Sequence, residues 1–447
     1  MLSRVNVGAP VLETGHIIKA PNFTLGDVLR ALPSLATEEL VSIVSHSIDT
    51  FSQIPFSTMA ADMYLIGPPV STKYPANFEK GYAAGRYLES SCADTKPVLG
   101  FCTWELIANK VGENLGRIER LVDEFCLQTE AVRKKHDDTF EHVFLFDDGL
   151  IDDITVNGLY RAGVDPHKIE QLLAKLKSED ISPGFWFSPI KIYPGSEIEK
   201  QHTDWLVKDE AGKNLSYGYW DCGVMEDKFT SKNIPKYFKN SFKSAQYVLD
   251  ITKPEVQKMQ LDKIKGMYDK GFRYLKMDFL YMMYNKAVKD PLVVDVAFEE
   301  FIGNIRKDCP DLRLMACSAP SHLVHLFEDT RIGPDLAPSL AKTTIKDFKS
   351  SAQAKLFEGF LQHINKENYP NVLRAFLPKA ALPAHPDFNA LILPEHGLEP
   401  SQVQSLHDLM SLVSRISKRA PNFIMGDDLE KVKPRQVMDF VGKVYGL

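Results

Sequence analysis

The sequence predicts an α/β protein whose main part is a closed (β/α)8 barrel. From residue 97 onward, short apolar segments of strand length alternate with amphipathic helical segments, and this alternation is typical of a parallel sheet. Eight such units follow one another, which is the number of strands that closes this kind of barrel. The 447 residues leave room for it, because such a barrel takes about 250 residues before loop insertions.

The expected strands share a short apolar centre and a polar or acidic end. They lie at 98–103 (VLGFCT), 142–146 (HVFLF), 184–187 (GFWF), 273–277 (RYLKM), 312–316 (LRLMA), around 330–332, near 379–382 and at 422–425 (NFIM). Segments such as HKIEQLLAKLKSED between them have apolar residues at helical spacing. The interval from Phe187 to Arg273 is longer than a usual connection and rich in Trp, Tyr and Gly, so we expect it to form one wall of a binding site.

Residues 1–96 differ from the rest and are expected to form a short, partly helical N-terminal extension, with the barrel occupying 97–447. The segment FTLGDVLRALPSLATEELVSIVSHSIDTF has apolar residues at helical spacing, and Thr37 suits a helix start. The extension contains no catalytic motif and is interpreted as a structural cap. No full β-sandwich domain is expected on either side of the barrel.

Composition excludes several classes of partner. The chain is 44% hydrophobic and 25% charged, and its formal charge of -6 gives no electrostatic footprint for nucleic acid or an anionic membrane. No apolar run reaches the roughly 20 residues that span a bilayer. The N-terminus lacks the apolar region of a secretory signal, and the six cysteines are scattered without a CxxC pair. We therefore expect reduced thiols and a cytoplasmic location, and leave a homo-oligomer open.

Active sites of such barrels lie at the C-terminal ends of the strands, where YLKMDF places Lys276 and Asp278. The two residues are two apart, so in a strand they point to the same side. A carboxylate beside a lysine stays ionised, as a nucleophile must. A buried ion pair inside the barrel explains the same pattern equally well.

The segment RIGPDLAP places Arg331 and Asp335 on either side of a Gly-Pro turn. Such a turn can aim both side chains inward, and an aspartate whose ionised form is destabilised can serve as a general acid and then as a base. The more common role of a Pro-Asp pair is a surface turn with the aspartate at a helix cap.

Asp147 and Asp148 end a wholly apolar strand. Paired acids there can bind a metal or accept hydrogen bonds from sugar hydroxyls. The nearby His136 and His142 suggest a metal, but His142 begins the strand that the acids end, which favours hydroxyl binding. Trp104 and Trp186 offer apolar surface to sugar rings, although tryptophan in a barrel is often part of the core.

Taken in order, these segments resemble the melibiase-type α-galactosidases of glycoside hydrolase family thirty-six and their clan relatives. VLGFCTW resembles the family's G-W-C-S-W motif, FLFDDG its D-D-G strand, and YLKMDF its Y-L-K-W-D segment. Further motifs follow in the family's order: GFWFSP with QHTDWLVKD, LDITKPEV, MACSAP, RIGPDLAP and HPDFNALIL. The resemblance covers roughly residues 98–432.

The resemblance implies a retaining glycosidase with Asp278 as nucleophile and Asp335 as general acid/base, acting on a terminal α-linked galactose without metal or cofactor. The other residues that carry over contact the sugar. They are Trp104, Asp147, Asp148, Trp186, Lys276, Cys317 and Arg331. Alternatives on the same site are an α-N-acetylgalactosaminidase and an α-galactosyl transglycosidase.

Several positions depart from the family pattern. Ser188 stands where an acidic residue is common, Ala319 and Pro320 replace a glycine pair, and the seventh strand, read from KAALPAHPD, lacks a tryptophan. Two other classes compete with a glycosidase. A non-catalytic sugar-binding barrel needs neither aspartate in a catalytic position, and a metal-dependent barrel enzyme needs histidine and carboxylate ligands gathered at strand ends.

Overall fold

The computed structural model describes residues 95–107, 110–217, 246–284, 291–317, 319, 321–331, 384–394, 398–416 and 419–447. Among them, eight parallel strands form a closed barrel in the order β1-β11-β10-β9-β8-β7-β3-β2. The strands are β1 (Val98–Cys102), β2 (Glu141–Phe146), β3 (Ser182–Phe187), β7 (Tyr274–Met277), β8 (Arg313–Ala316), β9 (Asp329–Arg331), β10 (His385–Ala390) and β11 (Asn422–Met425). The predicted (β/α)8 barrel is therefore confirmed.

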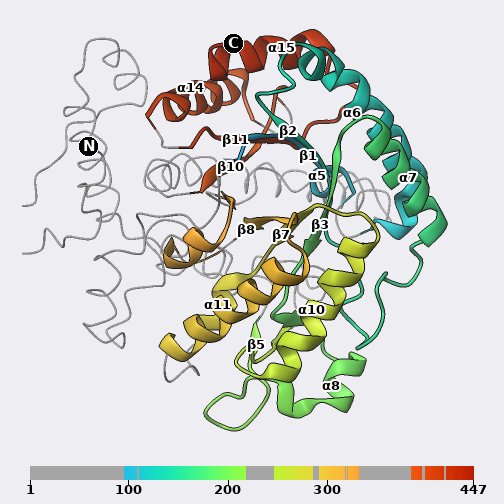
Figure 1. The fold of residues 1–447 in the computed structure, drawn as a ribbon, viewed down its shortest axis with the longest axis vertical. Coiled ribbons are helices and arrows are strands. Elements are labelled where there is room, and N and C mark those ends of the chain that lie inside the picture. Colours follow the sequence, from blue (N-terminus) through green and yellow to red (C-terminus); the bar gives the residue numbers. More distant parts are fainter. Residues whose placement is uncertain are drawn as a thin grey trace, which may run out of the picture.

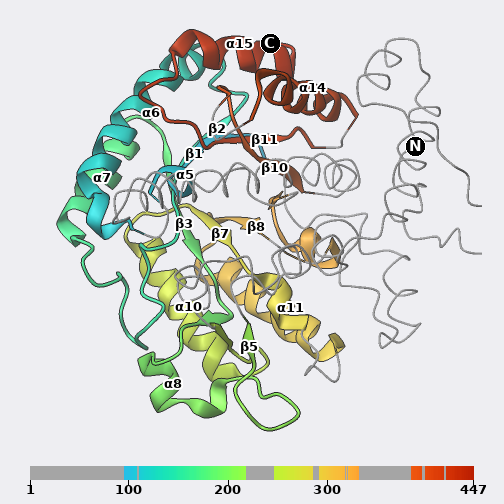
Figure 2. The same cartoon turned by 180° about the vertical axis from the view of Figure 1, so that it is seen from behind.

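Helices cover the outside of the barrel. Figure 1 shows α6 (Leu115–Lys135), α7 (Pro166–Ser178), α14 (Pro400–Ile416) and α15 (Pro434–Tyr445) along one side, and α10 (Pro254–Asp269) and α11 (Pro291–Asp308) along the other. The view from behind in Figure 2 gives the same arrangement. Shorter helical elements are α5 (Trp104–Ile107), α8 (Glu197–Gln201), η3 (Gly112–Asn114), η4 (Thr203–Trp205), η5 (Leu280–Tyr284) and η6 (Ser321–Leu326). No helix in the described ranges has the length and apolar character needed to cross a bilayer.

Local sequence explains where these helices begin and end. At α7, the Asp165 carboxylate caps the start by accepting a hydrogen bond of 3.0 Å from the backbone N of His167, with Pro166 as the first helical residue. At α15, Pro434 again opens the helix, and Gly446 ends it with a φ of 72°, a left-handed conformation that glycine adopts without strain.

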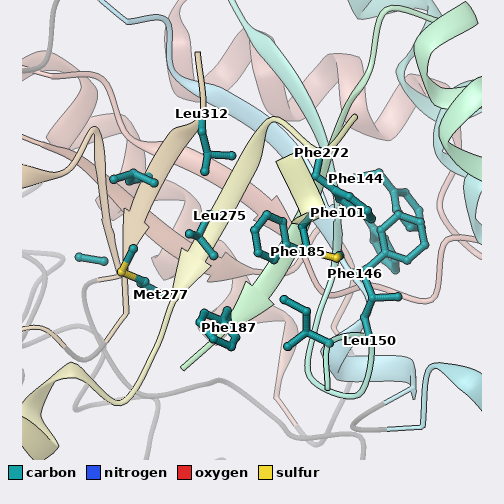
Figure 3. Close-up of a cluster of buried hydrophobic side chains, with 14 of the residues drawn as sticks. Phe101, Phe144, Phe146, Leu150, Phe185, Phe187, Phe272, Leu275, Met277 and Leu312 are labelled. Atoms are coloured by element: carbon teal, nitrogen blue, oxygen red, sulfur yellow. The ribbon is translucent and has the colours of Figure 1, made fainter. Parts of the chain in front are cut away.

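Side chains alternate along each strand between the helices and the barrel interior. Figure 3 shows a large cluster against the helices that includes Phe101, Phe144 and Phe146. The Phe144 ring lies 5.3 Å from that of Phe101 and 5.2 Å from that of Phe146, centroid to centroid. A second cluster fills the barrel interior and consists of Val98, Cys102, Val143, Leu145, Tyr274, Met315 and Ile424. The interior is thus a packed core, with its polar residues confined to the two ends.

A buried polar network, here called the floor cluster, closes the N-terminal end of the barrel; it consists of Glu141, Arg313, Asp329 and Asn422. The Arg313 guanidinium donates to both carboxylate oxygens of Asp329 at 2.7 and 2.6 Å and to Glu141 Oε2 at 2.6 Å. Asn422 Nδ2 donates to Asp329 Oδ1 at 2.6 Å. The carboxylates raise the pKa of Arg313 despite its burial, so the cluster holds one permanent cation between two acids.

All barrel strands except β10 overlap the positions predicted from the sequence. The position of β10, the seventh barrel strand along the chain, is corrected. It lies at His385–Ala390, whereas the predicted stretch near 379–382 lies outside the described residues. The segment HPDFNA carries polar residues at interior positions, because His385 bonds to Thr95 and Ala420 and Asp387 bonds to Arg331. An apolar strand pattern is therefore missing there. Residues 1–94, which contain nearly all of the predicted extension, also lie outside the described residues.

The long interval after β3 forms a small antiparallel sheet in its described part, with the order β4-β6-β5. The strands are β4 (Lys191–Ile192), β5 (Ser216–Tyr217) and β6 (Gln246–Val248). β4 follows β3 almost directly, so it lies beside the C-terminal end of the barrel. That this interval forms one wall of a binding site stays a prediction, and residues 218–245 are not described.

Candidate active site

A buried ion pair lies at the C-terminal end of the barrel interior. Lys276, the third residue of β7, donates to Asp147 Oδ2 at 2.9 Å, and both side chains are almost fully buried. Burial lowers the pKa of Lys276, but the Asp147 carboxylate outweighs burial and raises that pKa well above its ordinary value. Lys276 therefore stays charged at neutral pH. The same pair can also serve a purely structural role, but its position at the end where such barrels bind ligands favours a functional one.

The Asp147 carboxylate is fixed from several sides. Its Oδ2 also accepts a hydrogen bond of 3.1 Å from the Cys102 thiol, and its Oδ1 accepts one of 2.8 Å from the backbone N of Asp148. Burial first, and then the negative charge of Asp147, raises the pKa of Cys102, so this thiol remains a protonated donor. Asp147 thus presents a preorganised carboxylate.

Asp278 follows β7 directly, and both of its carboxylate oxygens have donors. Trp186 Nε1 donates to Oδ2 at 3.0 Å, and the backbone N of Phe279 donates to Oδ1 at 2.6 Å. The backbone N of Asp278 continues the sheet by donating to the Phe187 carbonyl at 3.0 Å. The carboxylate is half-buried, so it keeps access to a ligand while its orientation is fixed.

Phe279 has an unusual backbone conformation for an aromatic residue. Its φ is 58°, in the left-handed region, which costs a non-glycine residue about 1–3 kcal/mol. The same conformation aims the Phe279 N–H at the Asp278 carboxylate. Strain of this kind persists where surrounding contacts over-determine the geometry.

The two adjacent acids after β2 have different partners. Asp147 pairs with Lys276, whereas Asp148 pairs with Arg161 Nη2 at 3.2 Å and lies 4.0 Å from Lys191 Nζ. Asp153 lies against the same two cations, at 2.8 and 4.0 Å. The structure therefore does not place Asp147 and Asp148 as one pair facing the interior. Hydroxyl binding by Asp148 stays a prediction.

Arg331, at the end of β9, contacts a carboxylate that the sequence did not bring forward. Its Nε donates to Asp387 Oδ2 at 2.6 Å, and both side chains are buried. Burial raises the pKa of Asp387, and Arg331 opposes that effect. Asp387 sits at the third position of β10; it lies within the motif HPDFNALIL, but no role was predicted for it because the strand candidate was placed near 379–382.

Two further predicted residues, Cys317 and Trp104, also lie at this end, together with Ser188. Cys317 follows β8, is buried, and donates its backbone N–H to the Met277 carbonyl at 2.7 Å. Trp104 follows β1 and packs against the interior cluster. Among the described residues, Trp104 Nε1 and the Ser188 hydroxyl are buried polar groups without a hydrogen-bond partner. Buried polar groups without a partner are uncommon in folded proteins, so each of the two is a candidate contact for a bound molecule.

The predicted acid/base, Asp335, lies outside the described residues, as do Pro320 and Ser318. His142 is the second residue of β2, at the opposite end of the strand from Asp147, as predicted. Within the described ranges, no three His, Cys, Asp or Glu side chains gather as metal ligands would.

No protein-family model matches the sequence. Solved structures with a similar fold include α-galactosidases. One, from Thermus thermophilus in complex with p-nitrophenyl α-D-galactopyranoside, has a TM-score of 0.54 and 18% identity and is matched over 82% of this chain and 65% of its own. Another, the family GH36 α-galactosidase AgaA from Geobacillus stearothermophilus, has a TM-score of 0.51 and 14% identity, over 80% of this chain and 43% of its own.

This chain thus spans about two thirds of the length of the Thermus enzyme and less than half of the Geobacillus enzyme. At these identities the likeness shows a shared fold. The Geobacillus enzyme is described as a member of the family that the sequence motifs resemble.

Proposed function

We propose that this protein is a retaining glycosidase that removes a terminal α-linked galactose, with Asp278 as nucleophile. The observation that carries the proposal is the Asp278 carboxylate, which is half-buried at the C-terminal end of the barrel and has a donor on each oxygen. Oriented hydrogen bonds keep a carboxylate in place for attack without reorganisation at the moment of reaction. The ordered motifs and the shared fold of α-galactosidases support the same reaction class.

The proposed reaction is a double displacement. An oxygen of Asp278 attacks the anomeric carbon while the bond to the leaving oxygen breaks, and Asp335 gives its proton to that oxygen. Asp335 then removes a proton from a water molecule, whose oxygen attacks the anomeric carbon. The ester bond to Asp278 breaks, which releases the sugar and restores both carboxyl groups. In such enzymes the two carboxyl groups stand about 5–5.5 Å apart.

The polar residues around Asp278 suit a sugar. The Lys276–Asp147 pair supplies a charged donor and acceptor at this end of the barrel, and Arg331 ends β9, where it pairs with Asp387. Trp104 offers a ring face together with an unused indole N–H among the described residues. Such a combination of apolar surface and oriented polar groups is what sugar recognition needs. The Thermus structure with p-nitrophenyl α-D-galactopyranoside supports galactose as the first substrate to test.

The test is hydrolysis of a panel of aryl α-glycosides by the wild type, by Asp278→Ala and by Asp262→Ala. Asp262 is an exposed carboxylate on α10 and provides the matched control. We expect activity on the α-galactoside that Asp262→Ala keeps and Asp278→Ala loses, with partial recovery when azide replaces the missing carboxylate. Loss in both variants, or full activity in Asp278→Ala, would contradict the assignment of the nucleophile.

The panel also separates the alternatives. Preference for the α-N-acetylgalactosaminide, or sugar transfer to an added acceptor in place of hydrolysis, would keep the nucleophile and change the substrate. Binding of galactose without turnover of any glycoside would indicate a sugar-binding barrel. Loss of activity on treatment with a chelator would favour a metal-dependent enzyme.

A further inference from the structure

Lys191 is a fully buried lysine that the proposed reaction does not use. It is the first residue of β4, and its side chain is 1% exposed. Its Nζ lies 4.7 Å from the ring centroid of Trp186, 4.6 Å from that of Tyr193 and 5.1 Å from that of Phe279. These distances are within the range of cation–π interactions, so three rings surround the ammonium group.

Charged groups keep this lysine protonated. Asp148 Oδ2 and Asp153 Oδ2 each lie 4.0 Å from Nζ, and Tyr193 Oη accepts a hydrogen bond of 3.0 Å. Burial lowers the pKa of Lys191, but the carboxylates and the tyrosine together raise it above its ordinary value. Arg161, which contacts the same two carboxylates, completes a cluster of two cations and two anions.

Two of the three rings belong to the residues that hold Asp278. Trp186 donates its indole N–H to Asp278 Oδ2, and Phe279 donates its backbone N–H to Oδ1. The two rings meet edge to face, with centroids 6.2 Å apart. Phe279 keeps a left-handed backbone, which needs support from its surroundings. The Lys191 ammonium lies against both rings and so supplies part of that support.

We propose that Lys191 is a positioning residue for the Asp278 carboxylate, acting through the rings of Trp186 and Phe279. The ammonium group attracts both ring faces and thereby fixes the directions of the two N–H donors. A cation over the indole face also draws electron density from the ring, which makes the indole N–H a stronger donor to Asp278. The inference rests on the proposed function, in which Asp278 is the nucleophile.

The direct readout is the indole N–H of Trp186 in the full-length protein. The chain has four tryptophans, so 15N-tryptophan labelling gives four indole signals, and Trp186→Phe identifies one of them. Asp278→Asn removes the charge of the acceptor and should displace this signal. We expect the displacement to be smaller when Asp278→Asn is made in a Lys191→Met background, because the hydrogen bond is already loosened there.

Two variants serve as matched controls. Arg161→Gln removes a cation from the same two carboxylates, and the structure shows no contact of Arg161 with the rings of Trp186 or Phe279. Lys191→Arg keeps a cation over the rings. In both backgrounds Asp278→Asn should displace the Trp186 signal as far as it does in the wild type. If Lys191→Met fails to fold, the double change Lys191→Met with Asp153→Asn keeps the cluster neutral and carries the same prediction.

Kinetics give a second readout if the protein hydrolyses a glycoside. Misplacing the nucleophile should lower kcat in Lys191→Met about tenfold or more with little change in KM, and Lys191→Arg should recover most of the loss. An undiminished displacement of the Trp186 signal in Lys191→Met, or an equal reduction in Arg161→Gln, would overturn the inference. An inactive wild type whose Trp186 signal behaves as expected would refute only the proposed function.

Discussion

The floor cluster and the C-terminal end of the barrel differ in how their buried polar side chains are satisfied. In the floor cluster, Arg313 divides its donors between Asp329 and Glu141, and Asn422 bonds to Asp329. At the C-terminal end, within the described residues, Trp104 Nε1 and Ser188 Oγ are buried and have no partner. A satisfied buried network stabilises the fold, whereas unused donors and acceptors cost stability unless a ligand binds them. The comparison predicts that changes at one end reduce stability and changes at the other reduce activity.

Asp278→Asn should produce the largest effect, and it should fall on activity alone. Hydrolysis of the preferred glycoside should decrease by at least about a thousandfold, because the amide cannot form the glycosyl ester. The free energy of unfolding should change by less than about 1 kcal/mol, because the amide oxygen still accepts a hydrogen bond and the side chain is only half-buried. Urea unfolding and steady-state kinetics measure the two quantities. A destabilised but active variant would show that Asp278 contributes to stability and not to activity.

Arg313→Met should have the opposite profile. It leaves the fully buried Asp329 carboxylate without its cation, which typically costs about 3–5 kcal/mol, and removes the partner of the partly exposed Glu141. The free energy of unfolding should fall by that amount in denaturant titrations. The kcat of the remaining folded protein should stay near the wild-type value. A stable variant with reduced kcat would show that the floor cluster communicates with the other end.

His142 should make the free energy of unfolding depend on pH. Its ring lies buried near the N-terminal end of the barrel, with no partner for either nitrogen among the described residues. Burial lowers its pKa from 6.5 to about 4. The folded state thus favours the neutral ring, so this contribution to stability is complete above pH 6.5 and disappears as the pH falls to about 4. The loss amounts to roughly 3 kcal/mol, from 1.36 kcal/mol for each pKa unit. In His142→Phe this part of the pH dependence should vanish, and parallel stability–pH curves for the two proteins would contradict it.

The smallest effect is expected for an ion pair on the surface. Arg435 and Asp439 on α15 lie 3.7 Å apart, with side chains 90% and 70% exposed. Solvent screens such a pair, so Arg435→Ala should shift Tm by no more than about 1–2 °C in a thermal melt. If Arg435→Ala lowered the Tm as much as Arg313→Met does, burial would not explain why the Arg313–Asp329 pair contributes more to stability than the Arg435–Asp439 pair.

The fold followed from the sequence wherever a strand has an apolar centre. β1, β2 and β3 carry continuous apolar runs because the interior and the helices both bury them. β10 was expected a few residues too early because its interior positions hold His385 and Asp387, whose partners come from distant parts of the chain. No local pattern reveals a polar residue that a remote partner satisfies.

The site was predictable in part for the same reason. Asp147, Lys276 and Asp278 end apolar strands, and the end of a barrel strand is itself a signal in the sequence. Lys191 and Asp387 gave no such signal, because their roles depend on the Trp186 ring and the Arg331 guanidinium that the fold brings beside them. The place of Asp335 remains a prediction from the motif RIGPDLAP.

The most direct test of the account is to trap the covalent intermediate. The wild type is incubated with 5-fluoro-α-galactosyl fluoride, a probe that forms a glycosyl ester quickly and loses it slowly, and is then digested and analysed by mass spectrometry. The account predicts one added fluorogalactosyl group, on the peptide that contains Asp278, and none in Asp278→Asn. A label on another carboxylate, or an enzyme that cleaves the α-galactoside with inversion and forms no adduct, would contradict the assignment of Asp278 as the nucleophile.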